Sequence, residues 1–579
     1  THCISSAASD VYKRQMKKLL SLCTLAACSA LVQAQPSSTP TWTESFKAVA
    51  EVADAHRTAP VAITQDGNVY STGRFNQTIA TDKIFLEPVA QDSYLIKYDK
   101  AGNELWGVQL AGSATIKAMV TDAEENVYIT GTLADKVVFN TTSGETITLE
   151  GKKGDDGSFV STQSFSFVAK YDANGTLLTA KTLSAEKHPS ITEMEGNGYL
   201  YFSEGGVVEA IQLDIDKEKL YISASYTGKA HFENLSLQAS LVDISGFMVE
   251  DVQHFAIVSL SAEDLSQAKL VAELKPSAPI TQEVAYNTYS FSFTESLGSI
   301  YIGAIGCGNL TLATPNASKD FTFFFPGNGI TEYGHIIASI NGNDLQTASY
   351  SAPKTTTENK KTIDEIQIDG NTLYVGGVFN DTLAFDNTVF STNKTDLYVA
   401  ALNKNTLEVT NTWVSGYDEE DNNKNEEVFT SMLAAEDNIY LNGYRKQMSD
   451  NTILNGLSYT IENDKISGTN TNGFITDGAV NDKSLVFAEI DKDGNNAVNY
   501  YQDILSSIEC IKDNKTLPAQ RVGNTFYFAE PNDITVYDLQ GRMLKQANHA
   551  TSVSIDDLNQ GIYILSNGKS TLKAQKTNF

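Results

Sequence analysis

A short motif recurs six times along this chain: a hydrophobic residue, a tyrosine, and a glycine or alanine three positions after the tyrosine. Its six copies contain Tyr70, Tyr128, Tyr221, Tyr301, Tyr374 and Tyr440. Successive tyrosines are 58, 93, 80, 73 and 66 residues apart. This spacing is too long for one turn of a solenoid and suits one blade of a propeller with loops of unequal length. The chain is therefore predicted to be a repeat protein.

A second strand-like segment follows the first in every repeat and ends in a polar turn. Its copies are Tyr94–Asp99, Phe167–Asp172, Phe255–Leu260, Ile336–Ile340, Tyr398–Asn403 and Val486–Asp491. The first repeat contains four strand-like segments, namely Val61–Ile63, Val69–Gly73, Tyr94–Asp99 and Glu104–Leu110. Four antiparallel strands per unit are typical of a propeller blade.

The composition of the chain indicates an all-β fold. Its 26 tyrosines and 26 phenylalanines stand with valine, isoleucine and threonine in short alternating runs, separated by turn dipeptides such as Asp66-Gly67 and Asn174-Gly175. We predict a β-propeller of six four-stranded blades, followed by a small C-terminal β-sandwich. The alternative is a seventh blade, assembled from Trp42 to Val52 and a C-terminal strand that closes the ring.

The first repeat carries a longer pattern than the tyrosine motif alone. Its residues are Tyr70, Gly73, Phe75, Lys97, Tyr98, Asp99, Gly102, Asn103 and Trp106. This order resembles the bacterial β-propeller repeat of secreted and surface proteins. The second repeat keeps the pattern but has Thr179 in place of the tryptophan, the fifth keeps Trp413, and the third and fourth are degenerate. The resemblance implies a propeller over residues 59–507.

The beginning of the chain has the parts of an export signal. Residues 1–15 lack periodicity and are interpreted as a non-native leader. Two lysines, an apolar run and a small-residue cleavage sequence follow Met16, as in a secretory signal peptide. We predict a signal peptide at residues 16–34, with cleavage between Ala34 and Gln35. The alternative is a lipoprotein signal acylated at Cys28. Residues 35–58 are expected to form a linker or an N-terminal strand.

The tail, residues 508–579, begins a new composition. Two of its strand-like segments carry a hydrophobic-Tyr-Asp-x-x-Gly-Arg motif and a Leu-x-x-Gly-hydrophobic-Tyr motif. The motif residues are Tyr537, Asp538, Gly541, Arg542, Gly561 and Tyr563. The tail is similar to the C-terminal sorting domain of the type IX secretion system of Bacteroidetes. The resemblance implies export across the outer membrane, the type IX machinery as a partner, and release or attachment at the cell surface. The alternative is a last β domain without a sorting role.

Charge and hydrophobicity exclude several classes of partner. The chain has 42 basic and 71 acidic residues, a formal net charge of −29, and no basic stripe, which argues against nucleic-acid binding. No segment after the signal approaches the roughly 20 apolar residues of a spanning helix, so no transmembrane segment is predicted. Beyond the signal only Cys307 and Cys510 remain, so no disulfide framework is expected.

Local motifs for catalysis, cofactors or metals are not found, so no catalytic, cofactor-binding or metal-binding residue is predicted. The histidines show no metal-ligand spacing and are each expected on the surface or in a loop: His56, His188, His231, His254, His335 and His549. Asp491–Asn495 resembles the start of a calcium loop, but we interpret it as a hairpin turn equivalent to Asp99–Asn103. Alternating Phe321, Phe323 and Phe325 are expected to pack in the core rather than line a sugar-binding groove.

Two classes of function remain. The first is a secreted or surface propeller without catalysis that binds glycan or protein through one face or through its long inserts, read as Thr81–Asp92, Thr141–Ser164 and Ser449–Lys483. Long ordered loops cost conformational entropy, which favours a role in recognition. The alternative is a glycan-directed hydrolase whose carboxylates converge at the central channel.

Overall fold

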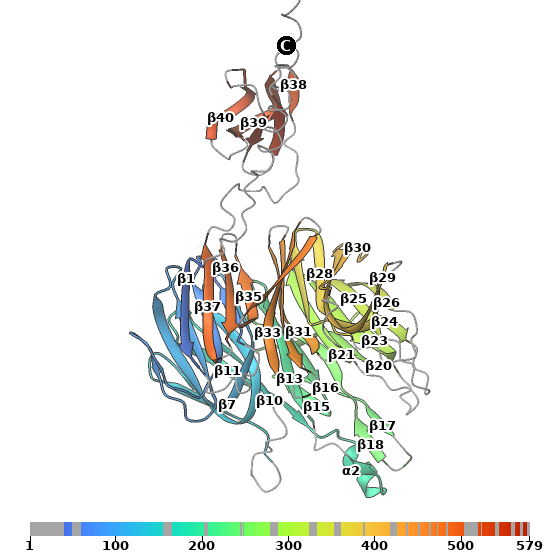
Figure 1. The fold of residues 1–579 in the computed structure, drawn as a ribbon. Helices are drawn as coiled ribbons and strands as arrows, with labels where there is room; N and C mark the ends of the chain where they lie inside the picture. The colour runs from blue at the N-terminus through green and yellow to red at the C-terminus, as the bar shows by residue number, and fades with distance from the viewer. Residues whose placement is uncertain are drawn as a thin grey trace, which may run out of the picture. The chain divides into compact units, whose positions relative to one another are not determined.

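The computed structural model describes residues 40–48, 59–153, 165–201, 206–243, 246, 248–277, 288–323, 333–351, 361–385, 388–416, 425–435, 438–447, 449, 452–462, 465–471, 473–481, 484–491, 493–502, 519–522, 524–538, 543–556, 558, 562–567 and 571–575. The contacts within the chain separate Thr41–Tyr500 from a second unit that contains the tail, Tyr501–Phe579. The two units are described in turn (Figure 1).

Seven groups of four antiparallel strands can be traced in the described part of Thr41–Tyr500, and we number them as blades 1 to 7; blades 1 and 2 share one long strand and so belong to one larger sheet. Blade 1 contains β2 (Val61–Ile63), β3 (Val69–Phe75), β6 (Asp92–Tyr98) and the first part of β7 (Glu104–Thr121); blade 2 contains the second part of β7, β8 (Val127–Asn140), β10 (Phe165–Tyr171) and β11 (Leu177–Glu186). Blade 3 contains β13 (Val208–Ile215), β14 (Lys219–Tyr226), β19 (His254–Ser261) and β20 (Lys269–Pro276); blade 4 contains β21 (Thr288–Ser296), β22 (Ser299–Gly306), β25 (Gly334–Asn341) and β26 (Asp344–Ser351).

The remaining three blades follow the same order. Blade 5 contains β27 (Glu365–Asp369), β28 (Thr372–Phe385), β29 (Thr388–Asn403) and β30 (Val409–Val414); blade 6 contains β31 (Asn425–Ala435), β32 (Asn438–Gln447), β33 (Ile453–Glu462) and β34 (Lys465–Thr471). Blade 7 contains β35 (Phe474–Val480), β36 (Ser484–Ile490), β37 (Asn495–Gln502) and β1 (Trp42–Lys47). The first strands of successive blades contact one another in a closed ring, from β2 through β7, β13, β21, β27 and β31 to β35 and back to β2. The predicted all-β propeller is confirmed.

Blade 7 joins the two ends of the repeat region in one sheet. β1 pairs antiparallel with β37, from Trp42 opposite Tyr500 to Lys47 opposite Asn495, as the alternative with a closing blade required (Figure 1). The interpretation of Val486–Asp491 as the later strand of the sixth repeat was wrong, because this segment is the second strand of blade 7. Leu485 and Val486 follow the first turn of that blade, where the other repeats have a hydrophobic residue and tyrosine. The tyrosine motif therefore has no seventh copy.

Several inserts form strands instead of free loops. β15 (Lys229–Phe232) and β16 (Leu235–Gln238) extend the outer edge of blade 2 at β11, and β23 (Gly308–Ala313) and β24 (Ser318–Phe323) extend blade 3 at β20. The end of β8 pairs with β7 of blade 1 and with β9 (Thr146–Glu150). Each of these hairpins comes from the following blade. Because a bare strand edge exposes unpaired N–H and C=O groups, these hairpins cover edges.

This arrangement corrects the interpretation of the inserts as recognition loops. Ser449–Lys483 is not an insert, because it contains β33, β34 and β35. Thr81–Asp92 contains β5 (Phe85–Leu86), which pairs with β4 (Ile79–Ala80), and Thr141–Ser164 contains β9. A blade strand with few apolar residues on its buried side has only a weak alternation of apolar and polar residues. From the sequence, such a strand is hard to distinguish from a polar loop.

The described remainder of this unit is small. α2 (Ile191–Gly196) and β12 (Leu200–Tyr201) follow blade 2, and β12 pairs with β18 (Met248–Asp251), which pairs with β17 (Leu241–Asp243). Phe321 and Phe323 are buried in the core that blades 3 and 4 share, which confirms the core assignment for these two residues. Phe325 lies outside the described residues. Among the helices that the structure describes, none is long and apolar enough to cross a membrane.

The second unit is a small antiparallel sheet. Its strands are β38 (Gln520–Val522), β39 (Thr525–Asp538), β40 (Met543–Ser554), β41 (Ile562–Ser566) and β42 (Thr571–Gln575). β39 pairs with β40 on one side and with β38 and β41 on the other. Alternate residues such as Ile534, Val536 and Leu565 are buried, so one set of side chains forms a core of its own.

Candidate functional site

Blade 1 contacts blade 2 through the side chains that define the repeat pattern. The Tyr70 hydroxyl donates to the Glu125 carbonyl oxygen at 2.6 Å. Lys97 Nζ donates to Glu125 Oε2 at 2.7 Å and to the Ala173 carbonyl oxygen at 3.1 Å. The indole N–H of Trp106 donates to the same Ala173 oxygen at 2.9 Å. The tyrosine, lysine and tryptophan of the repeat therefore bind the turns of the next blade.

Glu125 is the acidic partner in this contact. It lies in the turn between the first two strands of blade 2 with φ of 62°, a left-handed conformation that few residues other than glycine adopt. Its carboxylate also accepts hydrogen bonds from Thr64 at 3.0 Å and Asn68 at 2.8 Å. Burial alone would raise the pKa of Glu125, but the hydrogen bond and charge of Lys97 and the bonds from Thr64 and Asn68 outweigh it and lower the pKa.

The contact between blades 7 and 1 uses the same tryptophan position. The indole N–H of Trp42 donates to the Lys100 carbonyl oxygen at 3.2 Å, and its ring lies against Gly102. Trp106 lies in the same way against Gly175. Both glycines have φ above 80°, and an added Cβ would come within about 3 Å of the indole ring. Sequence reasoning missed this role of Trp42, although the tryptophan itself was the available signal.

Blades 2 and 3 meet differently. Lys170 lies opposite Tyr128 as Lys97 lies opposite Tyr70, and both ammonium groups stand 5.0 Å from the centre of that ring. Lys170 Nζ donates to the carbonyl oxygens of Ala262 at 2.8 Å and Glu263 at 3.4 Å. Its side chain is buried, yet among the described residues no carboxylate lies within ion-pair distance of it.

A cavity of about 680 Å³ adjoins Lys170 at this junction. Its charged lining consists of Lys170, Lys217, Lys219, Lys269, Asp122, Glu124, Glu218 and Glu263. The Tyr128 hydroxyl lies 2.7 Å from the Ala262 carbonyl oxygen and 3.0 Å from Asp122 Oδ2, and Asp122 also accepts the side-chain amide of Asn126 at 2.7 Å. The lining is therefore locally balanced in charge within a chain of net charge −29.

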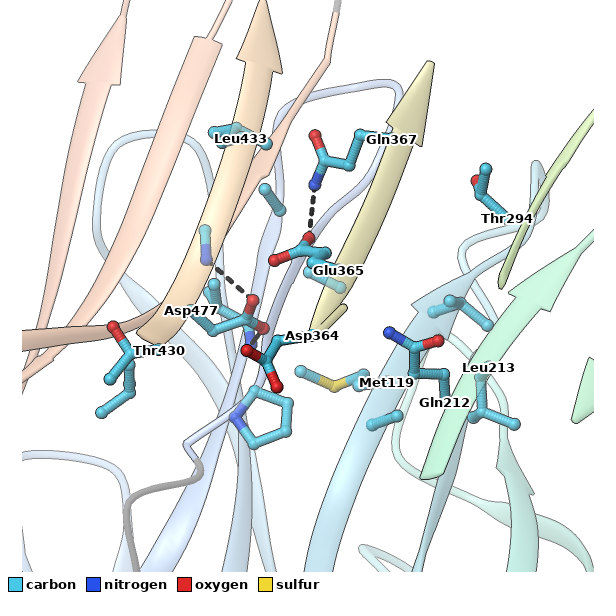
Figure 2. A pocket seen from close by; sticks show the side chains of 18 of the residues that line it. Met119, Gln212, Leu213, Thr294, Asp364, Glu365, Gln367, Thr430, Leu433 and Asp477 are labelled. Atoms are coloured by element: carbon cyan, nitrogen blue, oxygen red, sulfur yellow. Dashed lines mark hydrogen bonds between the residues drawn. The ribbon is translucent and has the colours of Figure 1, made fainter. Parts of the chain in front are cut away.

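The central channel is a second cavity, of about 800 Å³, lined by the first strands of all seven blades. Figure 2 shows Asp364, Glu365 and Asp477 near one another in its wall. Glu365 Oε2 accepts the N–H of Met432 at 2.6 Å, and Asp477 Oδ2 accepts the N–H of Val61 at 2.8 Å. Glu365 and Asp477 thus connect the first strand of one blade to the backbone of the next.

Hydrogen bonds from a backbone N–H of one blade to a side chain of the preceding blade recur around the channel. Asp214 accepts the N–H of Glu295 at 2.7 Å, Gln212 that of Phe293 at 3.0 Å, and Gln367 that of Ala434 at 2.8 Å. Burial, with the charge of Asp477 added, raises the pKa of Glu365 to about 8, and burial raises the pKa of Asp477 to about 7. The channel acids predicted for a hydrolase do converge, but they serve as acceptors for backbone groups.

The expectation that every histidine is exposed or in a loop was wrong for two of them, because His254 and His335 are buried in strands β19 and β25. His188 is buried too, but it lies in the loop after β11. His254 Nδ1 lies 2.9 Å from Glu273 Oε1, and the Tyr226 hydroxyl donates to the same carboxylate. His254 Nε2 accepts the backbone N–H of Ser240 at 3.1 Å, with the Ser240 hydroxyl at 3.1 Å.

Ser240, His254 and Glu273 are therefore linked by hydrogen bonds through the two ring nitrogens of His254. The ring nitrogen that a general base would use already accepts a backbone N–H, which is a structural role. His335 Nε2 lies 3.0 Å from the Tyr398 hydroxyl in the core. Strand positions can hold histidine when a partner satisfies its ring, and sequence spacing cannot show that partner.

The other candidate residues from the sequence are placed as follows. Asp491 Oδ1 accepts the N–H groups of Asp493 and Asn495, as a turn requires, but this turn joins the second and third strands of blade 7 and is not equivalent to Asp99–Asn103. Among the described residues no group of three or more His, Cys, Asp or Glu is arranged to hold a metal ion.

The two tail motifs lie on paired strands. Tyr537 is opposite Ile564 and Asp538 opposite Tyr563, on β39 and β41. The other predicted residues of the signal and tail lie outside the described residues, namely Ala34, Gln35, Cys28, Gly541, Arg542 and Gly561. His56 and Cys510 lie outside them too.

Comparisons with known proteins place the chain only broadly. No protein-family profile matches it. An uncharacterized WD repeat-containing protein of Acanthamoeba polyphaga mimivirus is 30% identical over 139 residues, which is 21% of this chain and 9% of that protein. The Dos1 propeller is 11% identical, with a TM-score of 0.37 over 80% of this chain and 95% of that one. The WD40 domain of SCAP from fission yeast is 10% identical, with a TM-score of 0.30 over 80% and 95%. The propeller assignment rests on the strand pairings above.

Proposed function

We propose that this protein is an exported propeller without catalytic activity, and that it binds a partner protein on its turn face. By turn face we mean the end of the blades that carries the turns between first and second strands and between third and fourth strands. These turns form the junctions around Glu125 and Lys170. A rigid ring of sheets presents such turns with little loss of conformational entropy on binding.

One observation carries the absence of catalysis. The convergent channel carboxylates Glu365 and Asp477, and Asp214 elsewhere in the channel wall, accept backbone N–H groups of the neighbouring blade. A catalytic acid or base must exchange protons with a substrate, whereas these groups hold the ring together. The hydrolase alternative therefore has acids in the right place but with their acceptor atoms engaged.

The export part of the proposal is supported by the sequence. The signal peptide predicted at residues 16–34 supports passage across the inner membrane. The tail motifs support recognition by the type IX secretion machinery and a final location at the outer cell surface or outside the cell. The pairing of β39 with β41 brings the two motif strands together, as one recognition unit would need.

The first experiment tests binding and catalysis together. The protein from Gln35 onward is screened against matrix proteins, mucins and glycans, with product analysis of every mixture. We expect saturable binding of a protein and no released sugar or peptide. Glycan binding alone would redirect the proposal to carbohydrate. Product formation that Glu365→Gln or Asp477→Asn abolishes, while the fold is retained, would replace it with the hydrolase.

The second experiment tests export. In a host with type IX secretion, the protein truncated after Ser507 is expected to remain in the periplasm, while the full chain reaches the outside of the cell. Tyr537→Ala in the full chain is a milder variant, and Tyr527→Ala is its control, because Tyr527 is exposed on the same strand outside the motif. Surface display of the truncated protein at the level of the full chain would refute the sorting role.

A further inference from the structure

The cavity beside Lys170 is explained by a difference between two turns. In blade 2 the turn after the first strand runs from Asp122 to Asn126 and contains Glu125 in its left-handed conformation. In blade 3 the equivalent turn, Asp216–Lys219, is one residue shorter and contains no residue with positive φ. The residue that is missing is the one that would supply the carboxylate.

The lysine part of the recognition geometry is retained, whereas the Tyr128 hydroxyl already has the Ala262 carbonyl oxygen as its acceptor at 2.7 Å. Lys170 has the position of Lys97 in its strand, the same distance to its tyrosine ring, and carbonyl acceptors from the next blade. The exposed fraction of the residue is 7%, and among the described residues its ammonium group has carbonyl oxygens as partners and no carboxylate. A buried charge is stabilised most by an opposite charge with hydrogen bonds.

We propose that the cavity between blades 2 and 3 binds an acidic side chain of a partner polypeptide, whose carboxylate takes the place beside Lys170 that Glu125 occupies beside Lys97. This inference rests on the proposed function, since it names the group that the turn face recognises. The junction of blades 1 and 2 shows that the carboxylate of a glutamate on a peptide turn can lie beside this lysine position, with Glu125 Oε2 at 2.7 Å from Lys97 Nζ.

The rim of the cavity favours a single carboxylate over a polyanion. Lys217, Lys219 and Lys269 attract an anion, whereas Asp122, Glu124, Glu218 and Glu263 line the same cavity. A nucleic acid or a uronic-acid polymer would bring many negative charges against these four acids. A peptide can place one acid in the centre and donors or cations against the rim.

The chain itself supplies a probe. The acetylated and amidated peptide Asp-Ala-Glu-Glu-Asn copies residues 122–126, and its control has glutamine at the position of Glu125. The propeller, labelled with ¹³C-lysine, is titrated with each peptide while the lysine Cε–H signals are followed by NMR. We expect the signal of Lys170, assigned with Lys170→Arg, to shift and saturate with the first peptide only.

Variants then test the site. Lys170→Met is expected to weaken binding of the glutamate peptide by at least about tenfold, because one charge-assisted hydrogen bond is lost. Lys465→Met, which removes an exposed lysine outside the cavity, is expected to change it less than about twofold. The two peptides are compared on the unaltered protein, so the test remains decisive if Lys170→Met does not fold.

Two results would overturn the inference: equal binding of the glutamine peptide, or no saturable shift of Lys170 at any soluble peptide concentration. If the screen finds a protein partner and Lys170→Met does not change its binding, the proposed binding function is kept and the site at Lys170 is rejected. If neither a partner protein nor the peptide binds, the proposed function and the site at Lys170 are both rejected.

Discussion

The junction between blades 1 and 2 and the junction between blades 2 and 3 start from the same residues and end differently. Both have a lysine above a tyrosine ring at 5.0 Å. Lys97 forms an ion pair with Glu125, while Lys170 has only carbonyl oxygens and an adjoining cavity. One residue less in a turn thus separates a closed structural contact from a candidate binding site. The comparison teaches that a repeat motif can be structural in one copy and available for a ligand in the next.

The largest effect is expected where the ring closes. Trp42→Ala should lower the free energy of unfolding of the propeller by about 3 kcal/mol, as for other large aromatic side chains in packed sites. The reason is that Trp42 stacks on Tyr500 with ring centroids 5.1 Å apart and holds β1 against blade 1 through Lys100. Urea unfolding followed by far-UV circular dichroism measures the change.

The matched control is Thr179→Ala, since Thr179 occupies the tryptophan position in blade 2. It should change the free energy of unfolding by less than about 0.5 kcal/mol. A loss at Trp42 no larger than at Thr179 would mean that the N-terminal strand is not part of the cooperative unit.

A second test compares the two lysines directly. Lys97→Met should lower the free energy of unfolding by about 2 kcal/mol, because it leaves the carboxylate of Glu125 without its cation. Lys170→Met should cost about 1 kcal/mol or less, since it removes hydrogen bonds to carbonyl oxygens only. Urea midpoints of the two variants at pH 7 give the comparison. A larger loss at Lys170 would contradict the assignment of its cavity as an open site.

The channel acids should set a pH dependence of their own. Burial raises the pKa of Glu365 to about 8 and of Asp477 to about 7, so the folded state holds these protons more tightly than the unfolded chain. Their contribution to stability is therefore present below the pKa of an unfolded carboxyl and declines as pH rises toward 8. Between pH 5 and pH 8, the free energy of unfolding measured with urea should fall less for the double variant Glu365→Gln, Asp477→Asn than for the parent protein. An equal fall in the free energy of unfolding of both proteins would mean that other titrating groups cause the pH dependence.

The smallest effect, with the opposite sign, is expected from Glu125. Its pKa is lowered in the folded state, so its contribution is present above the unfolded pKa and is lost as pH falls through the folded value. The difference in urea midpoint between the parent and Lys97→Met should therefore shrink below about pH 4. The difference between the parent and Lys170→Met should not. Equal shrinkage in both pairs would show that the two junctions share an acidic partner.

Much of the fold could be predicted from the chain because each blade is a local unit. The tyrosine motifs mark the second strands of blades 1 to 6, and the turn before the first of them contains the expected Asp66-Gly67. The prediction of strands failed where residues other than the motif tyrosine stand at the motif position or where a strand is mostly polar. Val486 stands in place of tyrosine in blade 7, and the polar strand Lys465–Thr471 lies within the predicted insert Ser449–Lys483. Alternation with a weak apolar face does not distinguish an edge strand from a loop.

The candidate site could be predicted only in part. The repeat pattern with Lys97 was predicted to recur in the second repeat, but the shorter turn at Asp216–Lys219 was not predicted, because the limits of both turns come from the strand pairs. The absence of a counterpart of Glu125 from that turn became evident only from the contact of Glu125 in blade 2 with Lys97 in blade 1. The convergence of Glu365 with Asp477 likewise depends on positions more than 100 residues apart in the sequence.

The sequence by itself determined the all-β class, the repeat and the position of most strands, because side-chain alternation and turn chemistry act within a few residues. The tertiary structure decided how the ends of the ring join, which inserts become edge strands, and which charged groups have partners. These properties depend on contacts between blades, and the same lysine is satisfied or left open according to what the neighbouring blade brings to it.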